Sequence, residues 1–327
     1  LIGAGLVVAF PLLAVGGLHS NASEPVVNDR GIWISPDEVL LLPDYGPAWD
    51  ALVTHAQKPI APNLSDQNDD SNVRVLARAL VAVRTDSAQL RSEVLRALEE
   101  VQGTEVGARS LAVGRELMTY IVAAELVGLD GLEKERFKAW LQTVSDRDFQ
   151  GRTLRSTHED RPNNWGTHAG ASRLALALYL GDQKEIDRAA WVYRGFTGDS
   201  RGWRGFKFRE RWWQPESHSG DYGINPMDAT IRSLPVGGVL PDDQRRGGEF
   251  TWPPPRENYV YEALQGVIAQ AVMLERAGMP ALDCGDRAVL RAFQWLHDHA
   301  DYPAEGDDTW MPHIINKVYN TDFPAPV

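Results

Sequence analysis

The stretch GARSLAVGRELMTYIVAAELVGL, residues 107–129, carries the pattern that decides the fold class. Apolar residues recur in it at intervals of three, four and seven, at Leu111, Met118, Ile121, Val122 and Leu126. These intervals place the side chains on one face of an α-helix. Gly128 follows the last of them and predicts the helix end. We therefore expect a buried helix here.

The same period continues on both sides of this stretch, so the sequence predicts a mostly all-α protein. Helices are expected at 47–57, 72–84, 86–102, 107–128, 131–147, 164–181, 183–197, 257–277, 284–299 and 309–319. Short connections predict antiparallel neighbours in chain order. Residues 199–256 interrupt the pattern and are expected to be irregular or to hold the few strands, with a functional role. Residues 23–46 and the C-terminal tail are expected to wrap the surface.

Composition limits the kind of partner and the compartment. Among 327 residues the formal net charge is -12, which argues against a nucleic-acid partner. The apolar residues 1–22 are too short and interrupted for a comfortable membrane span and resemble a signal-peptide remnant. We expect a secreted or periplasmic protein, with a membrane anchor as the alternative. Residues 23–327 are expected to form a single domain, without internal disulfides because there is one cysteine.

The start of the helix expected at 164–181 holds more polar groups than a cap requires. Asn163, Asn164 and His168 lie within six residues, although one asparagine would suffice as N-cap. Asn164 and His168 share a helix face, and the N-terminus of a helix favours an anion. The group predicts a carboxylate-binding corner. The alternative is two asparagines that cap and turn the chain, beside a core histidine.

A second cluster lies in RENYVYEALQGVIAQA, residues 256–271. Tyr261 and Gln265 fall on one helix stripe, and Tyr259 flanks it. A tyrosine at a helix entrance, near a cation such as Arg256, is suited to proton transfer. Tyr259 and Tyr261 compete for this role, and a buried structural tyrosine is the alternative.

A third cluster is the basic and aromatic loop after residue 199. Aromatic rings stack on sugar faces and guanidinium groups pair with carboxylates, so the loop suits an acidic polysaccharide. The expected substrate contacts here and at the two helix starts are Asn163, Trp165, Arg204, Lys207, Arg209, His218, Tyr222, Arg245, Trp252 and Gln265. The alternation in RGFKFRERWW also fits a half-buried strand. Four loop carboxylates would serve a hydrolase instead, namely Glu216, Asp221, Asp242 and Asp243.

Several motifs together resemble the alginate lyase-like polysaccharide lyases, which include alginate and glucuronan lyases. They are NLSDQNDDSNVRVLARALVAVRT, LAVGRELMTYIVAAEL, NNWGTHAGASRLALALYLGD, GGVLPDDQRRGGEFTWPPPRENYVYEALQGVIAQA and GDDTWMPHIIN, spread over roughly residues 33 to 324. The resemblance implies an (α/α) toroid of helical hairpins that cleaves uronic-acid chains by β-elimination. One departure is that histidine follows the paired asparagines directly in the family, whereas here Trp165 follows and the histidine stands at position 168.

The resemblance also implies roles. Asn163, Asn164 and Arg246 or Arg256 would neutralise the uronate carboxylate, which stabilises the developing enolate. His168 or a deprotonated tyrosine would take the C5 proton, and Tyr259 or Tyr261 would give a proton to the departing O4. No metal or cofactor is needed, and the acidic polysaccharide is the sole partner implied. A glycoside hydrolase on a similar scaffold and a non-catalytic carbohydrate-binding protein are the alternatives.

Overall fold

The computed structural model describes residues 30–326, and most of these residues are helical. The helices are α1 (Pro36–Leu40), α2 (Pro47–Ala56), α3 (Ser71–Arg84), α4 (Ala88–Glu100), α5 (Ser110–Val127), α6 (Gly131–Asp146), α7 (Leu154–Asp160), α8 (Asn164–Leu180), α9 (Gln183–Phe196), α10 (Pro241–Gln244), α11 (Asn258–Arg276), α12 (Cys284–Asp298) and α13 (Trp310–Tyr319), with 3-10 turns η1 (Arg245–Gly247) and η2 (Gly306–Asp308). Strands β1 (Thr230–Ile231) and β2 (Leu234–Pro235) form one antiparallel pair. The all-α prediction, with strands confined to 199–256, is confirmed.

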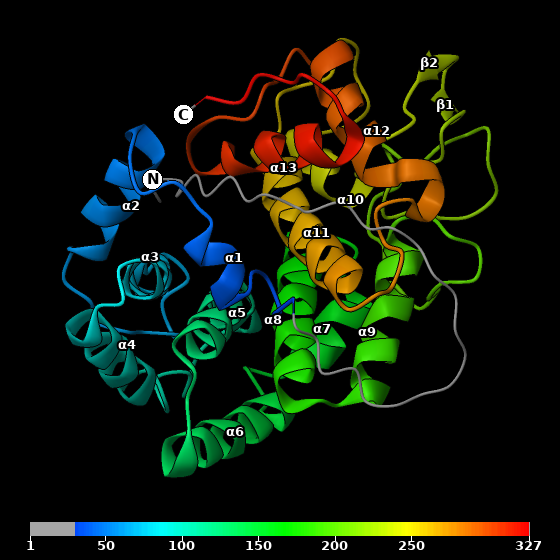
Figure 1. Ribbon diagram of the computed structural model, residues 1–327. Helices are drawn as coiled ribbons and strands as arrows, with labels where there is room; N and C mark the ends of the chain where they lie inside the picture. The colour runs from blue at the N-terminus through cyan, green and yellow to red at the C-terminus, as the bar shows by residue number, and fades with distance from the viewer. Residues whose placement is uncertain (1–29, 327) are drawn as a thin grey trace, which may run out of the picture.

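Four helices form an inner row in which each packs on the next, in the order α3, α5, α8 and α11. Outside this row, α4 packs on α3 and α5, α7 on α5 and α8, α9 on α8 and α11, and α12 on α11. In Figure 1 the colours pass around the molecule in chain order, from blue α2 through green α8 to orange α12. The alternation of inner and outer helices is the arrangement expected of an open, incomplete toroid of helical hairpins.

The inner helices α5, α8 and α11 run in the same direction. The Ser172 hydroxyl accepts from the Met118 N–H at 3.0 Å, and each residue lies eight positions after its helix start. His168 and Glu262, each four positions after a start, also meet. The first turns of these helices therefore lie at one end of the bundle, where polar residues from three elements can form one site.

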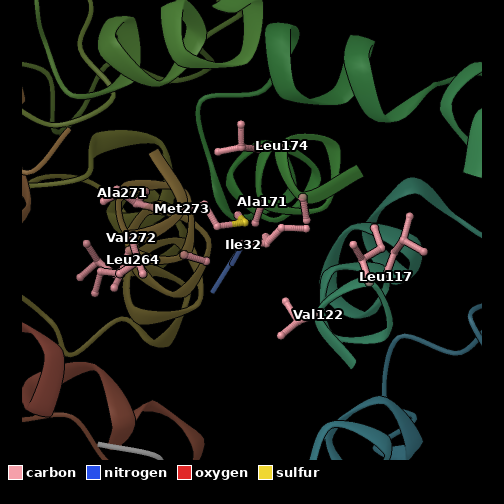
Figure 2. Packing of buried hydrophobic residues seen from close by; sticks show 14 of the residues in the cluster. Ile32, Leu117, Val122, Ala171, Leu174, Leu264, Ala271, Val272 and Met273 are labelled. Carbon is pink, nitrogen blue, oxygen red and sulfur yellow. The ribbon is translucent and has the colours of Figure 1, made fainter. Parts of the chain in front are cut away.

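Glycines allow the inner helices to approach closely. A Cβ at Gly114 of α5 would lie 2.9 Å from the Ala169 nitrogen, and one at Gly266 of α11 would lie 2.4 Å from the Thr167 carbonyl carbon. Apolar side chains of α5, α8 and α11 fill the remaining space, and Figure 2 shows Leu117, Ala171 and Met273 among them. This tight packing fixes the relative positions of the first turns.

Some expectations need correction. Helices α1, α7 and α10 were not predicted, because they are too short to show a helical period. Ile32, Ile34 and Val39 are buried, so residues 32–40 are part of the core and not only a surface wrapping. Residues 1–22, with the expected signal-peptide remnant, lie outside the described residues. In the described part of the chain, no helix combines the length and apolar character of a membrane span.

The alternating segment RGFKFRERWW forms no strand. Its backbone amides bond to groups outside any sheet: the Lys207 N–H donates to the Asp160 carbonyl at 2.7 Å, and the Arg209 N–H donates to Asp242 Oδ1 at 3.2 Å. The segment is therefore held against α7 and α10, which brings Arg209 towards the start of α8.

Candidate functional site

The start of α8 is built from both asparagines and two aspartates of α10. The N-cap is Asn163, whose side-chain oxygen accepts from the Trp165 N–H at 3.2 Å and whose amide donates to Asp242 Oδ2 at 2.7 Å. The Asn164 N–H donates to Asp243 Oδ1 at 3.1 Å. The acceptors favoured at this helix start are thus supplied by carboxyl groups of the protein itself. Burial raises the pKa of Asp243 well above its ordinary value, and Asp242 adds to that rise.

One turn further into α8, His168 meets charged residues from the two neighbouring inner helices. Its Nε2 lies 3.8 Å from Glu262 Oε2 on α11, and the same oxygen lies 3.3 Å from Arg115 Nη1 on α5. Burial lowers the pKa of His168, although Glu262 opposes this effect. Glu262 has a lowered pKa because contacts with His168 and Arg115 outweigh its burial. Near neutral pH the group therefore consists of a neutral imidazole, a carboxylate and a guanidinium.

The two candidate tyrosines have different environments. Tyr261 is fully buried, and its hydroxyl donates to the Tyr302 carbonyl at 2.7 Å. Tyr259 is 40% exposed, and the Arg246 guanidinium lies 3.7 Å from the centre of its ring. Arg256 is turned towards the surface, where it pairs with exposed Asp301 at 2.6 Å. Only Tyr259, of the two tyrosines, is open to a ligand.

Three arginines gather near the start of α8 without a carboxylate partner among the described residues. These are Arg161, Arg209 and Arg246, called here the arginine group. Burial lowers the pKa of Arg161, the nearby charges of Arg152, Arg209 and Arg246 lower it further, and Asp242 opposes this effect. The Arg161 guanidinium also lies 4.5 Å from the centre of the Trp165 ring. Among the described residues none of the three arginines has a carboxylate within ion-pair distance, so their combined positive charge favours an anionic ligand.

Other expected cations of the loop already have partners. Lys207 Nζ pairs with Asp160 at 2.8 Å, and Arg245 pairs with Asp242 and Glu210, both at 2.9 Å. Exposed Arg204 contacts the Asp199 carbonyl. Arg209 and Arg246 therefore lie together near Arg161. Arg204 lies at the Asp199 carbonyl and does not belong to the arginine group.

The remaining expected substrate contacts are dispersed. His218 pairs with Asp228 at 3.0 Å and packs edge-on to Tyr222, whose hydroxyl donates to the Ser219 carbonyl. Trp252 packs on His299. Gln265 donates to Asp308 Oδ1 at 2.8 Å, and burial raises the pKa of Asp308 to about 7. Of these residues, Gln265 is the one linked to the charged residues around Glu262, through its hydrogen bond to Asp308.

The loop carboxylates are each engaged by the protein. Asp242 and Asp243 hold the asparagines, Asp221 pairs with Arg211, and Glu216 accepts from the Arg232 N–H at 2.9 Å. Asp243 keeps a buried oxygen, Oδ2, without a hydrogen-bond partner, but each of the four has an oxygen in a hydrogen bond or ion pair, so these carboxylates do not offer two free groups as acid and base.

Sequence reasoning missed Arg161 and Arg115 as site residues, and it missed Glu116, next to Arg115 on α5, as a buried carboxyl. Arg161 stands two positions before the paired asparagines, and Arg115 and Glu116 interrupt the most apolar helix, so charged residues in an apolar run were the available signal. Glu116 is 2% exposed and neither of its carboxylate oxygens has a hydrogen-bond partner. Burial raises its pKa to about 9. Within residues 30–326, no three His, Cys, Asp or Glu side chains come together as metal ligands.

The region around the start of α8 also carries a family signature. Residues 72–202 match the alginate lyase family model. This confirms the resemblance seen in the motifs, and it supports a polysaccharide lyase activity in general terms. The match spans α3 to α9, including Arg161, Asn164 and His168, whereas Arg246 and Tyr259 lie beyond it. Comparison with curated proteins and with solved structures gave no significant match.

Proposed function

We propose that the protein cleaves a uronic-acid polysaccharide, such as alginate or glucuronan, by β-elimination. The observation that carries this proposal is the arginine group, three neighbouring cations without an ion pair among the described residues, in a protein of net charge -12. It adjoins Tyr259 through Arg246, and it adjoins the start of α8 through Trp165. A polymer substrate also agrees with the export expected from residues 1–22.

The proposed reaction begins with the uronate carboxylate held by the arginine group. Cationic donors near that carboxylate stabilise the enolate that forms when the C5 proton leaves. His168 takes this proton once its ring, 6% exposed at rest, is opened to the substrate, because burial keeps its imidazole neutral and able to accept. The electron pair of the C5–H bond forms the C4=C5 double bond, and the C4–O4 bond breaks. Tyr259 gives a proton to the departing O4.

The positions of these two groups are compatible with one sugar ring. Tyr259 and Glu262 are three residues apart on α11, so they share a face about one turn apart, roughly 5 Å along the axis. Glu262 contacts His168 directly. Tyr261 does not fit the role, because its hydroxyl is already bonded in the core.

The test is a panel of uronate polymers, including polymannuronate, polyguluronate and glucuronan, with a neutral glucan as control. A lyase leaves an unsaturated sugar that absorbs near ultraviolet light, so new absorbance on at least one acidic polymer is expected. New reducing ends without that absorbance would indicate a hydrolase. Binding without either change would indicate a carbohydrate-binding protein.

A further inference from the structure

Glu262 is a buried carboxylate that connects the three inner helices. It lies on the second turn of α11, and one of its oxygens faces both Arg115 of α5 and His168 of α8. Its side chain is 15% exposed. A carboxylate shared in this way restricts the orientation of the histidine ring, as in catalytic groups where an acidic residue holds an imidazole in position.

Among the described residues, the ion-pair partners of Glu262 are Arg115 and His168. Asp308 of η2 is the other acidic group near Glu262 and Arg115, and it accepts a hydrogen bond from Gln265. Glu262 Oε2 makes no well-directed hydrogen bond, although Arg115 Nη1 lies 3.3 Å from it, and His168 Nε2 makes none either. The 3.8 Å between Glu262 Oε2 and His168 Nε2 is longer than a hydrogen bond, so in this state the two side chains are neighbours without a hydrogen bond between these atoms.

We propose that Glu262 is a positioning residue, which orients His168 and pairs with its imidazolium once the histidine has taken a proton. The inference rests on the proposed function, in which that proton comes from C5 of the uronate. When the ring becomes charged, the attraction to Glu262 increases and stabilises the proton-transfer state. Arg115 acts in the opposite sense, since its charge opposes a second cation nearby.

The opposite charges of Glu262 and Arg115 provide the test, because removing each one should shift the titration of His168 in a different direction. Glu262→Gln keeps the shape and removes the negative charge, whereas Arg115→Met removes the positive charge. Imidazole NMR titration of the full chain is measured for the wild type and both variants, with His168→Gln to assign the resonance. The His168 titration midpoint is expected to move to lower pH in Glu262→Gln and to higher pH in Arg115→Met. Exposed Glu135→Gln serves as control and is expected to move neither.

Turnover gives a second readout. In Glu262→Gln, kcat should fall roughly tenfold to a hundredfold, less than the loss from removing a proton-transfer group, with little change in KM. The acidic limb of the pH–rate profile should follow the NMR midpoints, and Glu262→Asp should retain part of the wild-type limb. Midpoints that stay fixed, or that move the same way in both charge variants, overturn the inference. A wild type that cleaves no uronate polymer refutes the proposed function, while the NMR titration still decides the pairing.

Discussion

Glu116 should make the protein less stable as pH rises, and Glu116→Gln should remove this dependence. The carboxyl is 2% exposed, lacks a hydrogen-bond partner on either oxygen, and has a pKa raised to about 9 by burial, with Asp69 adding to the rise. In the unfolded chain the same group titrates near 4.5. Between these two values the unfolded state has lost the proton and the folded state keeps it, so unfolding becomes more favourable with every step in pH.

The magnitude follows from the difference between the two pKa values. Each pH unit above the unfolded value costs up to about 1.4 kcal/mol of folding free energy. At pH 7 the loss therefore reaches about 3 kcal/mol, an upper estimate for one buried carboxyl. Glutamine has a similar shape and no charge in either state, so the variant should gain this stability. An unsatisfied glutamine amide would add a constant offset, whereas the predicted gain grows with pH.

Urea denaturation at pH 5, 6, 7 and 8 measures the effect. The stability difference between Glu116→Gln and wild type should be small at pH 5 and should increase with pH by about 1 kcal/mol per unit. Glu135→Gln, an exposed position on α6, should show no such trend. A difference between variant and wild type that stays constant from pH 5 to pH 8 would refute the reasoning, because a carboxyl that is ionised in both states gives no pH dependence.

Three further predictions concern the site and its support. Tyr259→Phe should lower kcat roughly 10²–10⁴-fold with folding intact, whereas Tyr261→Phe should keep the rate and lose about 1 kcal/mol of unfolding free energy, as measured by turnover and urea denaturation. Equal losses of rate in both would contradict the assignment. Arg161→Gln with Arg209→Gln should raise KM about tenfold or more and weaken its dependence on salt, and an unchanged salt dependence would count against the arginine group. Gly266→Ala should cost about 1–3 kcal/mol, because the added methyl meets the backbone of α8, and a thermal unfolding scan would detect it.

The fold was predictable where the helical period extends over many residues. Helices α5, α8 and α11 begin and end within three residues of their expected bounds, because each has long apolar stripes and clear end signals such as Gly128 and Gly181. Helix α7 was missed because LRSTHED has no apolar face long enough to show a period. The alternation in RGFKFRERWW, after α9, also fitted a strand, but it comes from individual contacts and not from a sheet.

The site was predictable as a region and less so as individual contacts. Polar residues at the starts of α8 and α11 could be recognised because they exceed what a cap needs. Which of them would be free depended on partners far apart in sequence: Asp242 and Asp243 lie 79 residues from the asparagines that they bind. Likewise, sequence could not separate Tyr259 from Tyr261, because the choice depends on Tyr302, which lies 41 residues beyond Tyr261.

The position of the histidine gives a physical reason for the proposed pairing of Glu262 with protonated His168. In the family that this chain resembles, histidine directly follows the paired asparagines, at the position of Trp165 here. A shift of three residues, to position 168, keeps roughly the same helix face but moves the histidine about one turn into the bundle. At that depth burial opposes protonation, so a base at position 168 needs an anion to pair with its charged form. Glu262 is in place to supply this anion, and Trp165, with Arg161 over its ring, extends the cationic surface outside. The substitution of tryptophan for histidine therefore does not by itself remove a base from the site, and His168→Ala is expected to abolish turnover in the wild-type background.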